Sequence, residues 1–165
     1  MNQSSKLEKQ LFTDVTKLIE DSKQQLAQRA NSTLTYLYWR VGNRINKDFL
    51  AEKRATYGQR IVASLSDSLV QHYGNNFSEK NLRRMMQFAA VFPDEQIVVS
   101  AIRQLSWTHF IALIPLKDEI QREFYLELAK AERWNVKTLR KKIDSMLYER
   151  TAVSKKPAIF LAGYR

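Results

Sequence analysis

The sequence predicts an all-α fold, a multi-helix domain that contains a helix-turn-helix. Two observations lead to this prediction. Apolar residues recur at intervals of three and four along most of the 165 residues, which is the period of a helix buried on one side. Only four glycines and three prolines are present, too few for the many turns of a β architecture. One segment, residues 94–104, also fits a short strand, so a minor strand pair stays open.

Two long amphipathic helices are expected first. Ser5 to Glu8 has capping-box spacing, and apolar residues continue from there at helical intervals, which predicts a helix over residues 7–30. Asn31 and Ser32 are expected to separate it from a second helix over residues 34–49. Gly42 lies within the second helix and lacks a side chain, so we expect it to allow close packing against a neighbouring helix.

Residues 57–93 predict two further helices around a tight turn. Gly74 lies where a helix commonly ends in a left-handed residue. The hydroxyl of Ser78 can accept from the free amides of the next turn, so a second helix should begin at Glu79 and stop at Pro93. The segment of about residues 60–92 is therefore predicted to be a helix-turn-helix, with residues 79–90 as its recognition helix.

The outward side of that second helix is predicted to be cationic. Lys80, Arg83, Arg84 and Gln87 repeat at helical spacing on one side, and Asn81 lies beside them. No acidic residue is expected on that side. Positive charge suits DNA phosphates, and forked donors suit base edges in the major groove, so the side is predicted to contact duplex DNA. An ordinary solvated surface is the alternative, because most surface helices also have a charged side.

Beyond Pro93, residues 94–104 fit a helix or a strand equally well, and a strand there would be the material for a wing. We favour a helix because no Gly or Asn-Gly supports a hairpin. Ser106 is expected to cap a helix that ends at Pro115. Asp118, with Gln121 three residues later, should open the next one. That helix is expected to pack through Ile120, Phe124, Leu128 and Ala131.

Asn135 is expected to cap the last helix. Its inward residues should be Val136, Leu139, Ile143, Met146 and Leu147. Its outward residues Lys137, Arg140 and Lys141 form a second cationic side, expected to hold phosphates. The domain is expected to cover residues 1–150, and residues 151–165 are expected to be a basic, linker-like tail.

Composition narrows the class of partner. The formal net charge is +10 and the pI is about 9.9, which favours a polyanion through counterion release. There is no cysteine, so disulfides and thiolate zinc sites are excluded. No secretory signal is recognisable and no run is long enough to span a bilayer, so a cytoplasmic protein without a membrane partner is expected.

No constellation for catalysis can be assembled from the sequence. His72 and His109 lie in separate elements without clustered carboxylates, and helix-surface or packing roles are expected for them. A magnesium-dependent nuclease needs Asp and an Asp/Glu-x-Lys on adjoining strands, whereas the Asp21-Ser22-Lys23 run falls on a helix. The chain is therefore expected not to be an enzyme, and no metal, cofactor or small-molecule substrate is expected.

A set of short phrases covers nearly the whole chain up to about Pro157. The phrases are Leu37-Tyr38-Trp39-Arg40-Val41-Gly42, Tyr57-Gly58, Phe77-Ser78, Asn81-Leu82, Gln87-Phe88, Phe92-Pro93, Gln104-Leu105-Ser106-Trp107-Thr108-His109, Arg122-Glu123-Phe124-Tyr125, Trp134-Asn135-Val136 and Leu147-Tyr148-Glu149-Arg150. In their order and spacing they resemble the amino-terminal domain of the YhcG-type nucleases of the PD-(D/E)xK superfamily. The resemblance implies a helical, winged-helix-like or helix-turn-helix domain that precedes a nuclease domain in bacterial proteins, and we expect that nuclease half to be absent from this chain.

A weaker similarity, to the helix-turn-helix region of ParB-type partition proteins, rests on Phe77-Ser78 to Pro93, Leu105 to Leu113 and Asn135 to Ile143. It implies the same recognition helix, although the arginine box of that family is missing. The expectation is a DNA-binding domain. The rival is an oligomerisation or protein-interaction module in which the two long amino-terminal helices pair with a second copy or dock a nuclease partner.

Overall fold

The computed structural model describes residues 3–51 and 55–154, and all its regular elements are helical. An all-α fold is thereby confirmed. No strand occurs in the two described ranges, and within residues 94–104, where a wing was conceivable, Glu95–Ala101 form a helix followed by a turn. In chain order the elements are α1 (Gln3–Ala51), α2 (Ala55–Tyr73), the 3₁₀ turn η1 (Asn75–Phe77), α3 (Glu79–Val91), α4 (Glu95–Ala101), α5 (Trp107–Leu113), α6 (Glu119–Ala131), α7 (Val136–Asp144) and α8 (Leu147–Ser154).

The expected break between the first two helices is wrong, because α1 runs without interruption for 49 residues. Asn31 and Ser32 are neither Pro nor Gly, and their side chains do not form the hydrogen bonds that would end one helix or begin another. Ser32 Oγ donates to the carbonyl of Ile102 at 2.8 Å, and Asn31 accepts at its own carbonyl from Thr35 within the helix. Ser5 is not an N-cap either, since the helix is already formed at Gln3.

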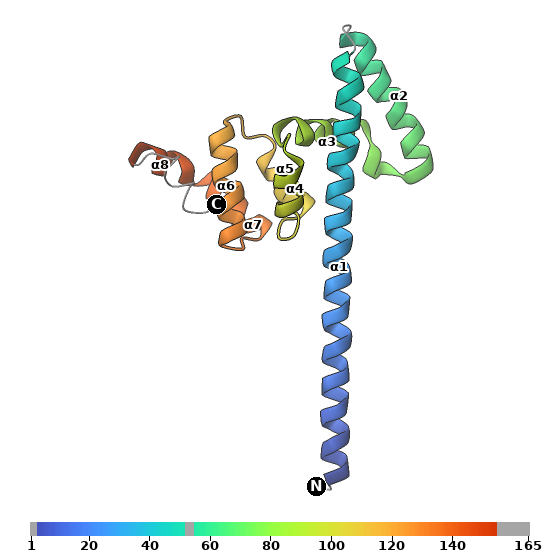
Figure 1. Cartoon of the computed structure of the whole chain (residues 1–165), viewed down its shortest axis with the longest axis vertical. Helices are drawn as coiled ribbons and strands as arrows, with labels where there is room; N and C mark the ends of the chain where they lie inside the picture. The colour runs from blue at the N-terminus through green and yellow to red at the C-terminus, as the bar shows by residue number, and fades with distance from the viewer. Residues whose placement is uncertain (1–2, 52–54, 155–165) are drawn as a thin grey trace.

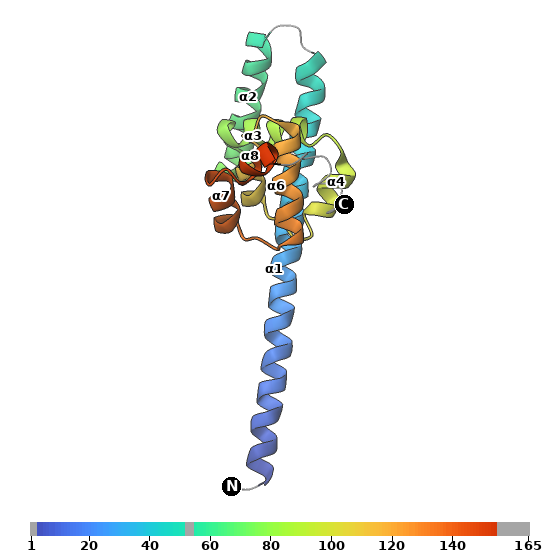
Figure 2. The same ribbon diagram turned by 90° about the vertical axis from the view of Figure 1, so that its left-hand side faces the viewer.

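α1 has two parts with different surroundings. From Lys6 to Asn31 every side chain is exposed, and most of this half projects away from the rest of the molecule in both views (Figures 1 and 2). Contact with the body formed by α2 to α8 begins near Gln28, which donates to the carbonyl of Arg103, and the side chains of α1 become buried from Thr35 onward. No helix of the described ranges has the length and apolar character needed to cross a membrane.

The crossing of α1 over α3 is unusually close. Gly42 is buried, and a Cβ built at this position would lie 1.8 Å from the carbonyl oxygen of Met85. One turn later, Asn46 Nδ2 donates to the carbonyl of Met86 at 2.8 Å, and one turn earlier Trp39 Nε1 donates to the carbonyl of Phe92 at 2.8 Å. The expected role of Gly42 in close helix packing is confirmed, and three successive turns of α1 fix the position of α3.

The buried residues form two clusters, one on each side of this crossing. Tyr38 points into the smaller cluster and the adjacent Trp39 into the larger. Phe88 of α3 packs against Phe110 of α5 with ring centroids 4.6 Å apart and ring planes tilted by 37°, which joins the helix-turn-helix to the rest of the body. The smaller cluster is Tyr38, Val62, Leu82 and Met85. The larger is Trp39, Phe88, Ala89, Phe92, Val98, Ala101, Leu105, Phe110, Ala112, Leu113, Ile114, Phe124, Tyr125, Leu126, Leu128, Ala129 and Leu139.

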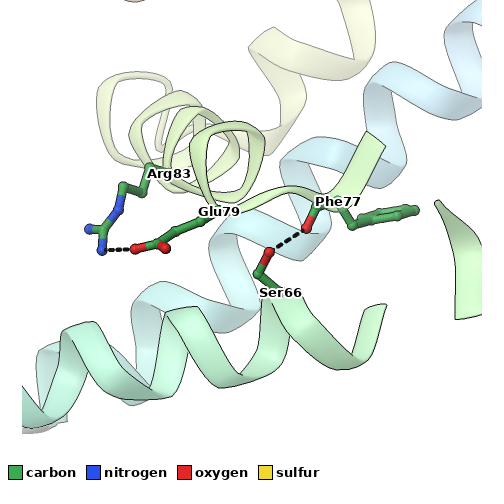
Figure 3. Close-up of polar contacts among 4 residues, drawn as sticks. All are labelled: Ser66, Phe77, Glu79 and Arg83. Carbon is green, nitrogen blue, oxygen red and sulfur yellow. Dashed lines mark hydrogen bonds and ion pairs between the residues drawn. The ribbon is translucent and has the colours of Figure 1, made fainter. Parts of the chain in front are cut away.

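The predicted helix-turn-helix is present as α2, η1 and α3. Gly74 ends α2 with φ +94°, where a side chain would be strained. Ser78 is the N-cap of α3 and accepts from the amide of Asn81, as predicted. Ser66 Oγ of α2 donates to the carbonyl of Phe77 at 3.0 Å and so ties the turn back onto α2 (Figure 3).

His109 has a packing role. Ser106 begins α5 as predicted, and a capping box joins its amide to Nδ1 of His109 at 3.0 Å. The other ring nitrogen lies 2.8 Å from the carbonyl of Trp134, so the imidazole links α5 to the loop before α7. In the described part of the chain, no group of three or more His, Asp or Glu is placed to hold a metal ion.

The carboxyl-terminal helices differ from prediction in two respects. Asp118 caps α6 as expected, but Gln121 donates to Glu149 rather than completing a capping box. Ile120 and Ala131, expected inside, are exposed. Tyr125, Leu126, Ala129 and Arg122 are buried beside Phe124 and Leu128, because α6 is covered on several sides.

The expected last helix is two helices. Met146 has φ +59° and is 55% exposed, and the chain turns there between α7 and α8. Helix α8 reaches Ser154 and so includes the first four residues of the segment predicted to be a tail, and residues 155–165 lie outside the described residues. Tyr125 Oη accepts from the amide of Tyr148 at 2.9 Å and holds α8 on α6. Burial raises the pKa of Tyr125.

Candidate nucleic-acid interface

The outward side of α3 carries the predicted polar residues. Lys80, Arg83 and Gln87 are exposed, and Asn81 and Arg84 are half-buried at the edges of the same side. The opposite side is the buried stripe of Leu82, Met85, Phe88 and Ala89. Burial against α1, α2 and α5 therefore fixes which side of α3 faces solvent.

One carboxylate lies among these cations, contrary to the expectation that the side is free of acidic residues. Glu79 Oε1 accepts from Arg83 Nη2 at 2.7 Å, and the two side chains are 47% and 43% exposed (Figure 3). The two residues are four positions apart, so they meet on one side of the helix. Arg83 is thus held by a neighbouring charge before any ligand arrives, and an exposed pair of this kind is weak enough to open.

The remaining residues of this side differ in how free they are. Gln87 Nε2 lies 3.4 Å from the carbonyl of Ile114, a long hydrogen bond that ligand contact can replace. Asn81 donates its backbone amide to Ser78 Oγ at 3.4 Å, and in the described part of the chain its side-chain amide has no hydrogen-bond partner. Within the described ranges, no polar partner is found for the side chains of Lys80 and Arg84.

The second cationic group lies on α7. Asn135 caps this helix by accepting from the amide of Thr138 at 2.8 Å, as predicted. Leu139 is fully buried, and Lys137, Arg140 and Lys141 are exposed on the other side. Helix α7 packs on α5 and α6, and α5 contacts α3 through Phe110 and Phe88, so the two cationic helices belong to one packed body.

Arg103 and Arg133 are two further cations that were not predicted to contact DNA. Both line an open groove of about 670 Å³ between the middle of α1 and the loops that follow α4 and α6. Gln28 Nε2 crosses this groove to donate to the carbonyl of Arg103 at 2.8 Å. Arg133 has φ +52°, in a turn that no sequence signal marks. Loop arginines lack helical spacing, so periodicity could not have found them.

Comparison with known proteins places the whole packed body in one family. The model of the DUF1016 N-terminal domain matches residues 14–150, a range that contains every residue considered above for nucleic-acid contact. The sequence is 25% identical over 175 residues to "Putative nuclease YhcG" of Escherichia coli (strain K12), covering 88% of this chain and 47% of that protein. The chain thus spans about half the length of this relative. No solved structure matches the chain. Because the family match covers most of the sequence, the chain belongs to the DUF1016 N-terminal domain family, the amino-terminal domain of YhcG-type proteins.

Proposed function

We propose that this chain is a duplex DNA-binding domain of a nuclease-related protein, with α3 in the major groove and α7 on the phosphates. The observation that supports the proposal most directly is the outward side of α3. It combines Lys80, Arg83 and Arg84 with the amide donors Asn81 and Gln87, on a helix whose other side is buried. Lysine and arginine neutralise phosphates, while Arg, Asn and Gln offer the paired donors and acceptors that base edges require.

The partner helix of the motif supports the same assignment. The whole of α2 carries only Arg60 and Asp67 as charged residues, and their charges cancel. α3 carries three cations against the single carboxylate of Glu79. The electrostatic attraction to a polyanion is therefore concentrated on the second helix, which is the one that enters the groove in helix-turn-helix proteins.

Charge outside the amino-terminal half of α1 strengthens the proposal. Residues 1–30 contain five Lys or Arg against four Asp or Glu, whereas residues 31–165 contain 22 against 13. Nine of the ten net positive charges therefore belong to the part of the chain that carries α3 and α7. Counterion release from DNA rewards such a concentration of positive charge.

A fluorescence-anisotropy titration of a labelled DNA duplex tests the proposal. Between about 50 mM and 200 mM salt, affinity should fall roughly a hundredfold if about four phosphates are neutralised. An RNA duplex of the same sequence is the control and should bind more weakly, because its major groove is too deep and narrow for side chains to read. Absence of binding, or affinity that is indifferent to salt, would contradict a DNA-binding role.

Replacing Glu79 with glutamine should strengthen DNA binding. The carboxylate competes with DNA phosphates for Arg83, and an exposed pair is worth up to about 1 kcal/mol, so the affinity should rise by about threefold to fivefold. The salt dependence should also become steeper. Glu119→Gln is the matched control, since Glu119 is likewise exposed at the first position of a helix, α6, but lies beside the carboxyl end of α3 rather than beside Arg83. Weaker DNA binding by the Glu79→Gln variant would contradict the proposal that Glu79 competes with DNA for Arg83.

A further inference from the structure

The amino-terminal half of α1 carries an apolar row that no described residue covers. Every side chain from Lys6 to Asn31 is exposed, and most of this arm extends beyond the body in both views, with Gln28 near its end bonded to Arg103 (Figures 1 and 2). At 1.5 Å per residue the arm is roughly 40 Å long. The members of the row and their exposed fractions are Leu7 71%, Leu11 62%, Phe12 73%, Val15 44%, Leu18 67%, Ile19 50% and Leu26 66%.

A row of this size needs a partner. A helix in water gains most of its stability from burying an apolar side, and this half of α1 buries none within the described structure. Monomeric proteins seldom expose contiguous apolar patches of more than a few hundred Å², and larger ones mark interaction sites. Spacings of four, four and three residues from Leu7 through Leu11 and Val15 to Leu18 keep the row on one side of the helix, as pairing with a second helix requires.

We propose that the arms of two copies of this chain pair along this row in antiparallel orientation. The net charge of the arm is consistent with self-association, because its five basic residues are nearly balanced by four acidic ones. The body carries the remaining positive charge, so two bodies repel each other. An antiparallel pair places the bodies at opposite ends, roughly 40 Å apart, where salt screens their repulsion.

Two charged residues within the row determine the orientation. Eighteen residues make five turns, so Glu8 lies on the same line along the helix as Leu26, and Arg29 on the same line as Leu11. In an antiparallel pair, the register that places Glu8 opposite Arg29 of the second copy also places Leu11 opposite Leu26. In a parallel pair, Glu8 and Arg29 would each face their own counterpart, and the like charges would repel.

Charges at the edges of the row have less influence. Asp14 and Asp21 lie along one edge, and an antiparallel pair brings like edges together. These carboxylates remain in solvent, and Gln10 Nε2 already donates to Asp14 Oδ1 at 2.9 Å. Exposed charges are hydrated and screened, whereas Glu8 and Arg29 meet within the seam where water is excluded. The seam therefore decides the orientation.

Sedimentation or light scattering across a concentration series tests the pairing with the full chain. A mass twice that of the 19.4 kDa chain is expected at high concentration. Leu11→Glu with Leu18→Glu should raise the dimer dissociation constant at least a hundredfold. Thr13→Glu with Gln24→Glu is the matched control, because it adds the same residues on the opposite side of the arm and should leave the dimer intact.

Charge reversal tests the orientation. Glu8→Arg or Arg29→Glu alone should raise the dissociation constant at least tenfold, and the two together should restore it, because the pair is re-formed with reversed signs. In a parallel pair each reversal exchanges one like-charged contact for another, so an unchanged dissociation constant overturns the antiparallel arrangement. A monomer at every concentration, or a dimer that survives the Leu11 and Leu18 changes, overturns the pairing itself. These outcomes are independent of whether the body binds DNA.

Discussion

Replacing Gly42 with alanine is expected to lower the free energy of unfolding by about 3 kcal/mol or more, at the upper end of the range for overpacked sites. The added methyl group would lie 1.8 Å from the carbonyl oxygen of Met85 and 2.3 Å from its carbon. Neither atom belongs to a flexible side chain, so α1 and α3 must move apart. That separation would also break the hydrogen bonds from Asn46 and Trp39 to the carbonyls of α3.

Thermal or denaturant unfolding followed by circular dichroism measures this effect. For a chain of this size, about 3 kcal/mol corresponds to a fall of roughly 6–12 °C in Tm. Asn43→Ala is the control, since it changes the neighbouring half-buried position of α1 without adding atoms. The sign of the change in the free energy of unfolding is informative. Where a helical glycine has room for a methyl group, replacement by alanine raises the free energy of unfolding by about 0.4–1 kcal/mol. A stabilised Gly42→Ala variant would therefore contradict the close crossing.

The local parts of the fold could be predicted from sequence because local chemistry specifies them. Gly74, Ser78 and Pro93 bound the second half of the helix-turn-helix, and each acts through its own backbone or side chain. Ser106 and Asn135 likewise cap α5 and α7 where expected. A cap of this kind is formed with the next three residues, so these helix starts do not depend on distant parts of the chain.

The predictions that were wrong concern segments in which tertiary contacts outweigh the local conformational preference of the residues. Ser32 resembles a helix start, but its hydroxyl bonds Ile102, 70 residues away, and α1 continues. Ile120 fits the apolar period of α6 and yet is exposed, because the neighbours of α6 decide which of its sides are covered. The turn at Met146 has a positive φ without glycine, so no residue type announces it. Periodicity predicts that a side is apolar but does not identify what covers it.

The candidate site was predictable in its position and only partly in its charge. Packing of Leu82, Met85 and Phe88 fixes the outward side of α3, and their spacing is visible in the sequence. The Glu79–Arg83 pair was also visible, since a glutamate four residues before an arginine commonly pairs with it. Arg103 and Arg133 line the same groove because their loops pack near each other. Their spacing in the sequence does not predict this arrangement.

Removing Arg83 and Arg84 together is the most direct test of α3 as the DNA-contacting helix. Arg83→Ala with Arg84→Ala is expected to cost on the order of 2 kcal/mol or more in DNA affinity, roughly thirtyfold. The slope of log affinity against log salt should become shallower by about two, because up to two phosphate contacts disappear. Neither residue is buried, so the unfolding transition should remain close to that of the unmodified chain.

The double variant Arg40→Ala with Arg44→Ala is the control. It distinguishes the loss of a direct DNA contact from the effect of lower net charge on DNA affinity. Both arginines are exposed on α1, and among the described residues their partners are local: Tyr36 lies beneath the guanidinium of Arg40, and Asp48 lies 3.0 Å from Arg44. This control removes the same two charges but leaves α3 intact. Equal losses of affinity in the two double variants would mean that DNA responds only to net charge. If DNA affinity is lost only when Arg83 and Arg84 are replaced, the phosphates or bases must lie against α3. The reason is that screening limits the range over which an exposed charge attracts DNA to about one Debye length, roughly 8–10 Å.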